Sequence, residues 1–321
     1  MRQLESIVGK RAKKMKLSIA IMSYNHKNYI EKAIRSVLAQ EIDFDYEVWI
    51  NDDCSTDGTQ DILRRLEKEL PDNFHIIYRE KNIGAVASFY DMYHNRLKGE
   101  YFATLEADDY WIYPKKLKTQ IEFLDSHPEY TAVAHNVEVV DENGEPRLDY
   151  IYPECKNDEY TLKDYQKGIL SGQTASLVCR NFYQSKAFKP FVCSVRWAGD
   201  GAKNFLLAAH GKVKCIQEVW SAYRYVTSQG DSYSATFKRD RDMENRFLIF
   251  HKEIYEHAVN EIKTKESIKI TEVMYMHYLL TAALKHKVDN ISMKDYFKAF
   301  GKAKNKFSCI GYSIKCLLSR K

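Results

Sequence analysis

A first group of carboxylates lies in Asn51–Thr59, where Asp52, Asp53 and Asp57 share six positions. One aspartate is enough to turn the chain and cap a following helix. Three like charges this close repel one another unless they accept hydrogen bonds or face a cation. We therefore predict that Asp53 contacts the base or ribose of a nucleotide, that Asp57 caps the next helix and that Ser55 fixes the loop.

A second group of carboxylates consists of Glu106, Asp108 and Asp109, within four consecutive residues. Carboxylate oxygens gathered on one short loop make a hard site that suits Mg²⁺ or Mn²⁺. A divalent ion there would neutralise a diphosphate leaving group as its bond breaks. The simpler alternative is a solvated acidic loop, but it leaves the adjoining aromatic residues Tyr110 and Trp111 unexplained.

The elements that must position these two groups alternate between strands and helices. Short apolar runs predict strands, and apolar residues at helical spacing predict the helices between them. In chain order these elements are expected at 17–22, 30–38, 46–51, 59–70, 74–78, 86–97, 101–105 and 114–124. Such alternation is typical of an α/β fold with a Rossmann-like, mostly parallel sheet flanked by helices. Ligands bind at the carboxyl ends of such strands, so we expect both acidic groups to face one crevice.

The pattern weakens beyond residue 132. We expect strands at 132–140 and 219–224, an irregular stretch at 150–163, and helices from 239 to the end.

The bulk properties exclude several classes of protein. A net charge of +5 on 321 residues is too modest to imply a nucleic-acid partner. No apolar stretch approaches the roughly 20 residues needed to cross a bilayer, and the basic start of the chain lacks the apolar segment of a signal peptide. Seven cysteines, an odd number with no CxxC pair, indicate reduced thiols and a cytoplasmic location.

The two acidic groups and their neighbours resemble the family 2 glycosyltransferases, which have the GT-A fold. The segments that carry the resemblance are Ile21–Asn25, Asp52–Thr59, Asn82–Gly84, Lys98–Tyr101 and Glu106–Trp111. Pro114–Leu117 and Gln120 also fit a branch whose acidic motif reads Glu-x-Asp-Asp-Tyr-Trp. The resemblance covers about residues 15–230 and is densest before 130.

The resemblance implies roles for individual residues. Asp108 matches the metal-binding aspartate of the family's DxD motif, and Asp109 follows it as a second candidate ligand. Glu106 stands where that motif has its first aspartate, near the ribose or the metal. The candidate nucleotide-sugar-binding residues are Ser23, Asn25, Asp52, Asp53, Glu106, Ala107, Asp108 and Arg224.

An inverting transfer needs a carboxylate that takes the proton of the acceptor hydroxyl. Asp200, ahead of the apolar helix at 205–209, resembles the family's catalytic aspartate, and an N-cap of that helix is the alternative. Arg224 ends a strand that resembles one ending in Tyr-Arg, and it could reach the diphosphate. Many relatives have a histidine two positions later, where this chain has Val226. Lys238 and Arg239 are further candidates on a closing loop.

These expectations divide the chain into three parts. Residues 1–15 form a basic N-terminal segment. Residues 16–235 form the catalytic domain, with a nucleotide-binding half at 16–130 and an acceptor half at 131–235. Residues 236–321 form a helical, basic C-terminal extension. Its last part, 294–321, interleaves lysines with apolar residues, so it either contacts an anionic membrane peripherally or packs on the domain with a solvated basic face.

The expected function is that of an inverting glycosyltransferase that needs Mn²⁺ or Mg²⁺. It would move a sugar from a nucleotide-sugar, a UDP-sugar, to a glycan or lipid-linked acceptor in bacterial capsule or O-antigen synthesis. Because the family often uses lipid-linked acceptors, we favour peripheral contact with the inner face of the plasma membrane. Rhamnosyl transfer from a dTDP-sugar is the nearest alternative. A nucleotidyltransferase would have a glycine-rich loop where the chain has Ser23–Asn28, and an inactive binding module would lack the acidic residues.

Overall fold

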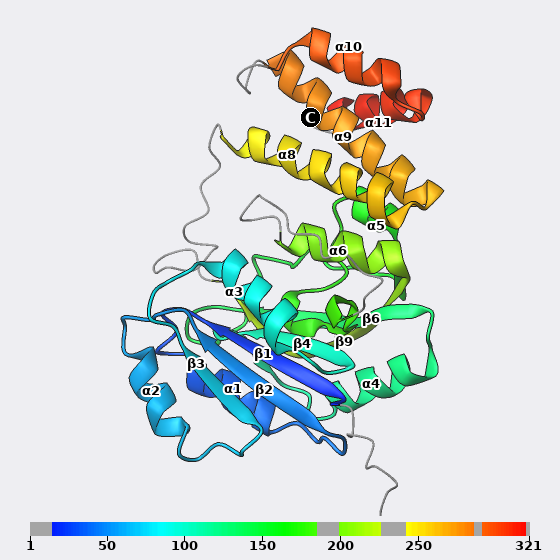
Figure 1. Ribbon diagram of the computed structural model, residues 1–321. Coiled ribbons are helices and arrows are strands. Elements are labelled where there is room, and N and C mark those ends of the chain that lie inside the picture. The colour runs from blue at the N-terminus through cyan, green and yellow to red at the C-terminus, as the bar shows by residue number, and fades with distance from the viewer. Residues whose placement is uncertain (1–14, 185–198, 226–241, 286–290, 319–321) are drawn as a thin grey trace, which may run out of the picture.

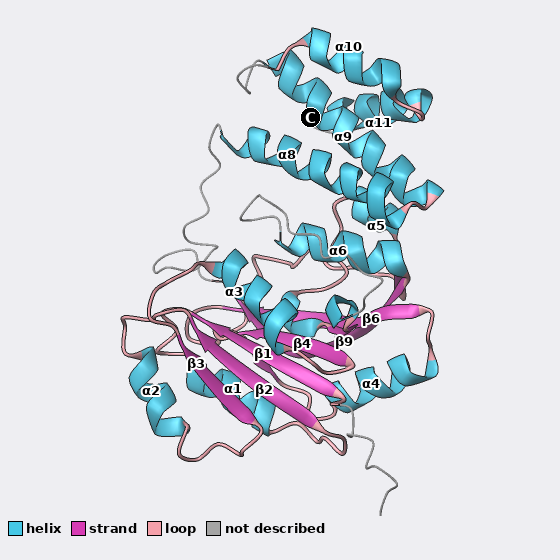
Figure 2. Ribbon diagram, in the orientation of Figure 1, coloured by secondary structure: helices cyan, strands magenta, loops and turns pink. Residues whose placement is uncertain are grey.

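A computed structural model describes residues 15–184, 199–225, 242–285 and 291–318. Its centre is one nine-stranded sheet in the order β3-β2-β1-β4-β8-β6-β9-β5, with β7 paired to β9. Helices cover both faces of the sheet, and a stack of C-terminal helices lies beyond one of them (Figure 1 and Figure 2). The strands are β1 (Leu17–Ser23), β2 (Tyr46–Asp52), β3 (Phe74–Tyr78), β4 (Tyr101–Glu106), β5 (Tyr110–Trp111), β6 (Tyr130–Val140), β7 (Glu159–Tyr160), β8 (Val178–Arg180) and β9 (Lys212–Arg224).

The first four strands of the chain pair in parallel, as predicted. All seven residues of β1 are buried, because a parallel sheet is covered on both faces. The register places Ser23 of β1 level with Asp52 of β2, and Met22 level with Glu106 of β4. The carboxyl ends of these strands therefore bring the two acidic groups to the same edge of the sheet.

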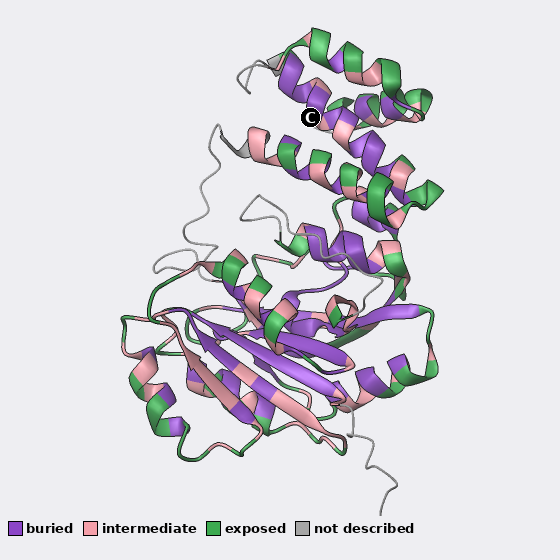
Figure 3. Cartoon of the chain, viewed as in Figure 1, coloured by how far each residue is buried: buried purple, intermediate pink, exposed green. Residues whose placement is uncertain are grey.

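The sheet lies between two layers of helices. Figure 3 shows that the strands are mostly buried and that the helices are exposed on their outer sides. One core joins the sheet to α1 (Ile30–Leu38), α2 (Thr59–Leu66) and α4 (Lys116–Ser126). On the other face lie α3 (Ala85–Asp91) and α6 (Gly199–His210). The helix expected at 86–97 ends early, because the chain widens into a π-helical turn, η1 (Met92–Arg96).

The second half of the sheet is mixed. β8 runs antiparallel between β4 and β6, whereas β6 and β9 are parallel to each other. The two-residue strand β5 follows the second acidic group directly and pairs antiparallel with the end of β9, with Tyr110 opposite Ala222. The stretch 150–163, expected to be irregular, in fact ends in β7 and the first residues of α5 (Leu162–Gln166). The short 3-10 turns are η2 (Thr174–Ser176) and η3 (Phe182–Gln184).

The C-terminal part is helical, as expected. It consists of α8 (Asp242–His257), the π-turn η4 (Ala258–Ile262), α9 (Lys265–Lys285), α10 (Met293–Lys302) and α11 (Lys306–Leu318). Phe250 and Ile254 of α8 belong to the same apolar core as Phe205 of α6, so this part packs directly on the sheet domain. The division predicted at 235 lies outside the described residues. No helix in the described part of the chain is long and apolar enough to cross a membrane.

Candidate active site

Asp52 ends β2 and builds the loop that follows it. Its side chain is completely buried. One carboxylate oxygen accepts a hydrogen bond from the Ser55 hydroxyl at 2.5 Å, and the other accepts from the Ser55 amide at 3.0 Å and from the Gln60 side chain at 2.7 Å. The structure thus shows a loop-building role for Asp52, and its contact with a donor stays a prediction.

Asp53 holds a second loop against the first. Its two oxygens accept the amides of Ile83 at 3.0 Å and Gly84 at 2.8 Å, and its residue is 4% exposed. Gly84 has a φ of +82°, a conformation that a side chain would oppose, and α3 begins at the next residue. The predicted nucleotide contact of Asp53 would come from this anchored carboxylate.

Asp57 holds the start of α2, but the N-cap itself is Gly58, one residue later than the predicted cap. One of its oxygens accepts the amide of Thr59 at 2.9 Å and the other accepts the amide of Lys27 at 2.9 Å. Burial opposes the charge, but the hydroxyl of Thr59 and these two amides together lower the pKa of Asp57. Every aspartate of the first group therefore has hydrogen-bond donors that stabilise its charge.

Ser23 and Asn25 follow β1 into the same crevice. The Ser23 hydroxyl is buried, and within the described residues it has no hydrogen-bond partner. Asn25 adopts a left-handed backbone, with φ +57°, and its side-chain oxygen accepts the amide of Thr56 at 2.9 Å. Next to it, His26 Nε2 lies 3.9 Å from a carboxylate oxygen of Asp108. This histidine links the loop after β1 to the second acidic group.

Asp109 is the buried support of the second acidic group. Its oxygens accept the Gln173 side chain at 2.7 Å and the Arg224 amide at 2.8 Å. Burial, together with the charges of Asp108 and Glu106, raises the pKa of Asp109 well above its usual value. Since both oxygens already accept hydrogen bonds, direct metal ligation by Asp109 stays a prediction, and the described contacts favour a supporting role.

Glu106 and Ala107 lead from β4 into the crevice. The Ala107 side chain is fully buried, and its amide donates to the Met22 carbonyl at 2.9 Å. Burial, then the charges of Asp108 and Asp200, raise the pKa of Glu106 to about 8. In the described residues Glu106 accepts one long hydrogen bond, from the Gln173 side chain at 3.5 Å. The charges of Asp108 and Asp200 act on it, and a cation would relieve this repulsion.

Asp108 is the part of this group that fits a metal ligand best. Its side chain is 21% exposed, and its carboxylate is not held by a backbone amide in any contact of the described residues. Across the described ranges, however, no three His, Cys, Asp or Glu side chains are arranged to hold an ion. This donor set fits Mg²⁺ or Mn²⁺ held by one or two carboxylates and completed by substrate phosphates.

Asp200 lies in the first turn of α6 and is exposed at its carboxylate, which is 56% accessible. One oxygen accepts the Thr174 hydroxyl at 3.1 Å and lies 3.3 Å from the Lys203 ammonium. Lys203 itself is buried and also donates to Thr174 at 3.1 Å. Because α6 begins at Gly199, Asp200 is inside the helix rather than its N-cap, and this placement leaves the carboxylate open to a substrate.

Arg224 lies behind the second acidic group rather than in front of it. Its guanidinium donates to the carbonyls of Asp108, at 3.0 Å, and Asp141, and it lies 4.3 Å from the Tyr29 ring centre. These contacts fix the acidic loop from the buried side. Contact between Arg224 and a diphosphate stays a prediction, and Lys238 and Arg239 lie outside the described residues.

Four tyrosines form a connected group, and one of them, Tyr152, lies within electrostatic reach of Asp200. Tyr150 stacks on Tyr225 with ring centres 4.2 Å apart, and Tyr152 meets Tyr223 edge to face at 5.2 Å. Burial and then the charge of Asp200 raise the pKa of Tyr152. Tyr223 immediately precedes Arg224, so this group of rings adjoins the residue that fixes the acidic loop.

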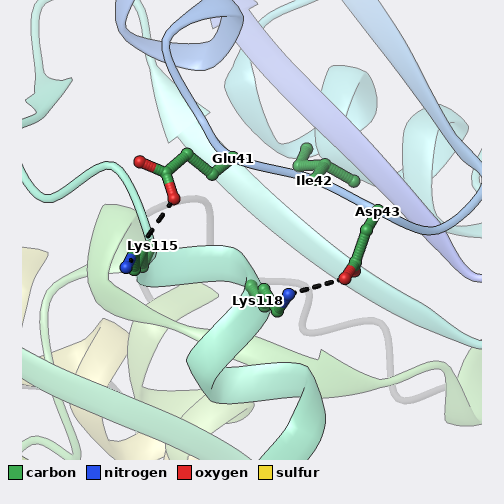
Figure 4. A pocket seen from close by; sticks show the side chains of 5 residues that line it. All are labelled: Glu41, Ile42, Asp43, Lys115 and Lys118. Atoms are coloured by element: carbon green, nitrogen blue, oxygen red, sulfur yellow. Dashed lines mark hydrogen bonds and ion pairs between the residues drawn. The ribbon is translucent and has the colours of Figure 1, made fainter.

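A surface hollow elsewhere in the fold has a different character. It is lined by Ile42 and by two ion pairs, Lys118–Asp43 at 2.6 Å and Lys115–Glu41 at 3.9 Å (Figure 4). It lies beside the segment that leads into the N-terminal end of β2, whereas both acidic groups follow carboxyl ends of strands. The hollow is therefore separate from the candidate active site.

Sequence reasoning missed the residues that connect the site. None of these residues belongs to a recognised motif, and each contacts a residue that is distant in the chain. They are His26, Gln173, Thr174 and Lys203. Lys203 stands three residues after Asp200, a helical spacing, but the helix was expected only at 205–209, so the sequence provided no signal for this pair. Gln173 and Thr174 lie in Gly168–Ser176, which lacks the ending of a phosphate-binding loop and which the family resemblance places near the acceptor, but the sequence predicted no role for either residue.

Comparison with known proteins assigns the chain to a family. Residues 18–185, just over half of the 321, match the family described as Glycosyl transferase family 2. The chain belongs to this family.

Two relatives show how far the similarity extends. An uncharacterised protein of Mycobacterium tuberculosis is 36% identical over 171 residues, which are 53% of this chain and 45% of that protein. A Bacillus subtilis glycosyltransferase, TuaG, whose name refers to teichuronic acid biosynthesis, is 42% identical over 108 residues, 34% of this chain and 41% of that one. The chain thus spans less than half the length of these relatives.

A solved structure shows the same fold. Residues 1–349 of Staphylococcus aureus TarS in complex with UDP-GlcNAc align with a TM-score of 0.60 at 19% identity, covering 90% of this chain and 80% of that one. The predicted GT-A fold class is confirmed.

Proposed function

We propose that the chain transfers a sugar from a UDP-sugar to a hydroxyl group of an acceptor, with inversion at the sugar carbon. The observation that carries this proposal is the pair Gln173 and Thr174. Gln173 donates to Asp109 of the acidic loop, and the next residue donates to Asp200. Two adjacent residues thus connect the acidic loop after β4 to an exposed carboxylate, Asp200, that can act as a base.

The residues of the site divide the chemistry between them. Asp53, Ser23 and Asn25 would bind the nucleoside at the ends of β1 and β2. Asp108 would hold Mn²⁺ or Mg²⁺, whose charge would stabilise the departing diphosphate. Gln173 and the backbone of Arg224 keep the acidic loop in place through Asp109.

Asp200 would perform the proton transfer. It accepts the proton of the acceptor hydroxyl as the oxygen of that group bonds to the sugar carbon, while the bond from this carbon to the diphosphate breaks. The nearby Lys203 ammonium, 3.3 Å from the carboxylate, holds the Asp200 side chain in position. A single in-line displacement of this kind inverts the configuration.

The acceptor is proposed to be a glycan, free or lipid-linked, of a bacterial surface polymer such as capsule or O-antigen. Tyr152, near Asp200, and the three tyrosines connected to it support a sugar-ring acceptor, since aromatic faces offer apolar surface with polar edges. The name of TuaG refers to teichuronic acid, and TarS is named as a poly(ribitol-phosphate) β-N-acetylglucosaminyltransferase. We place the chain in the branch with the Glu-x-Asp-Asp-Tyr-Trp motif, and on the cytoplasmic side of the membrane.

Calorimetric titration with UDP, dTDP and GDP, with and without Mn²⁺, tests this proposal. We expect UDP to bind tightly only with Mn²⁺, and Asp108→Ala to abolish this metal-dependent binding. Asp72→Ala is the matched control and should bind as wild type does. It removes an exposed carboxylate that precedes the N-terminal end of β3, whereas the site lies at the carboxyl ends of the strands. Preference for dTDP would favour rhamnosyl transfer instead, and the absence of any nucleotide binding would overturn the proposal.

A further inference from the structure

The outer face of α11 is apolar and exposed. Its members recur at helical spacing along one side of the helix, and we name them the α11 stripe. They are Phe307 (93% exposed), Ile310 (43%), Ile314 (53%), Leu317 (42%) and Leu318 (67%). A row of large apolar side chains facing water is costly unless it meets a partner, so its presence needs an explanation.

The opposite face of α11 is fully engaged in the fold. Cys309 and Ser313 are buried against the core that α11 shares with α9, and the Tyr312 hydroxyl donates to the carbonyl of Gln166 at 3.1 Å. The sequence left two alternatives for this segment: packing on the domain, or contact with a membrane. The structure shows packing through one face and leaves a second face free for another contact.

Positive charge borders the α11 stripe. At about 100° per residue, Lys306 and Lys315 project on its two sides, and both are exposed. Lys302 and Lys304, also exposed, lie just before the helix. From Tyr296 to Leu318 the sequence contains no acidic residue. Lysines at the border of an apolar helical face can place their stems along it and their ammonium groups outside.

We propose that α11 docks on an anionic lipid surface, with the α11 stripe at the boundary between headgroups and acyl chains and the bordering lysines against lipid phosphates. The 13 residues of α11 extend about 20 Å, less than the roughly 30 Å hydrocarbon core of a bilayer, so the helix lies in the plane of the membrane. An acid-free border complements anionic headgroups. A second copy of the chain fits less well, because two lysine-bordered faces would repel each other.

Co-sedimentation of the full chain with vesicles tests this proposal. We expect binding to vesicles of phosphatidylglycerol and phosphatidylcholine in equal parts, and little binding to phosphatidylcholine alone. Phe307→Asp should weaken binding about tenfold or more, because it places a charge in the apolar contact. Leu148→Asp is the matched control: Leu148 is 94% exposed on a loop after β6, and its variant should bind as wild type does. Both substitutions are at exposed positions, so an unchanged melting temperature confirms folding.

A charge variant separates the two parts of the surface. Replacing Lys302, Lys304 and Lys306 with Gln should weaken binding on the order of 100-fold at low salt and reduce its salt dependence. Equal binding of wild type and Phe307→Asp, or no binding to anionic vesicles, would overturn the proposal. A dimer in light scattering that Phe307→Asp dissociates, without vesicle binding, would assign the stripe to self-association instead. None of these readouts depends on sugar transfer, so the proposal can fail while the proposed activity stands.

Discussion

The loop after β2 and the loop after β4 each carry three carboxylates, but the fold surrounds these carboxylates differently. In the first, Asp52, Asp53 and Asp57 all accept hydrogen bonds from backbone amides, which stabilise their charge. In the second, burial and mutual repulsion raise the pKa of Glu106 and Asp109. A cluster of carboxylates in a sequence therefore does not by itself mark a cation site. What separates the two loops, among the described residues, is that every aspartate of the first accepts a backbone amide, whereas in the second only Asp109 does, from Arg224.

The largest expected effect is on the loop after β2. Asp53→Ala removes the acceptor for the amides of Ile83 and Gly84, so we expect the free energy of unfolding to fall by about 3 kcal/mol. Urea denaturation measures this value, with Asp72→Ala as a control that should change it by less than about 0.5 kcal/mol. If the two variants lost equal stability, the loop-building role of Asp53 would be wrong.

The opposite sign is expected for the loop after β4. At pH 7, in metal-free protein with a chelator present, Glu106→Gln removes a carboxyl group whose ionised form is disfavoured by burial and then by the charges of Asp108 and Asp200. The folded chain no longer has to protonate this group, so the free energy of unfolding should rise by on the order of 1 kcal/mol. The same denaturation experiment tests this prediction. The same substitution at an exposed residue, Glu122→Gln, is the control and should leave the free energy of unfolding nearly unchanged. A clear loss of stability would mean that Glu106 also helps to build the fold.

The smallest expected effect concerns pH. Asp57 has a lowered pKa in the folded state, so its contribution to stability is present above the pKa of the unfolded chain, near 3.8, and is lost as the pH falls through the folded value. Asp57→Asn should therefore be less stable than wild type at pH 7, and the difference should shrink below about pH 4. A difference that is constant from pH 7 to pH 3 would contradict this account.

The sequence predicted the strands of the first half and the convergence of the two acidic groups, because apolar periodicity and strand ends are local properties. It could not predict which carboxylates the fold supplies with hydrogen-bond donors. The partners of Asp109 are Gln173 and Arg224, 64 and 115 residues away, and no spacing rule joins them. The same holds for Arg224, whose guanidinium faces carbonyl groups that only the folded chain brings near.

Short elements were harder to predict than long ones. β5 has two residues, and its pairing with β9 fixes it more than its own sequence does. The π-turn η1 interrupts a helix whose apolar spacing continues without a break. For α11, the apolar spacing was visible, but only packing showed which face is buried.

The central claim is that Asp200 is the base of a sugar transfer. The direct test measures the release of nucleoside diphosphate from a nucleotide-sugar that carries the nucleotide selected by calorimetry. Either added glycan or water serves as the acceptor. We predict that Asp200→Asn binds the donor as wild type does but releases diphosphate at least about 100-fold more slowly. The control Asp158→Asn, at a side chain that is 81% accessible, should remain active. If Asp200→Asn released diphosphate within about threefold of the wild-type rate, the account of the site would be contradicted.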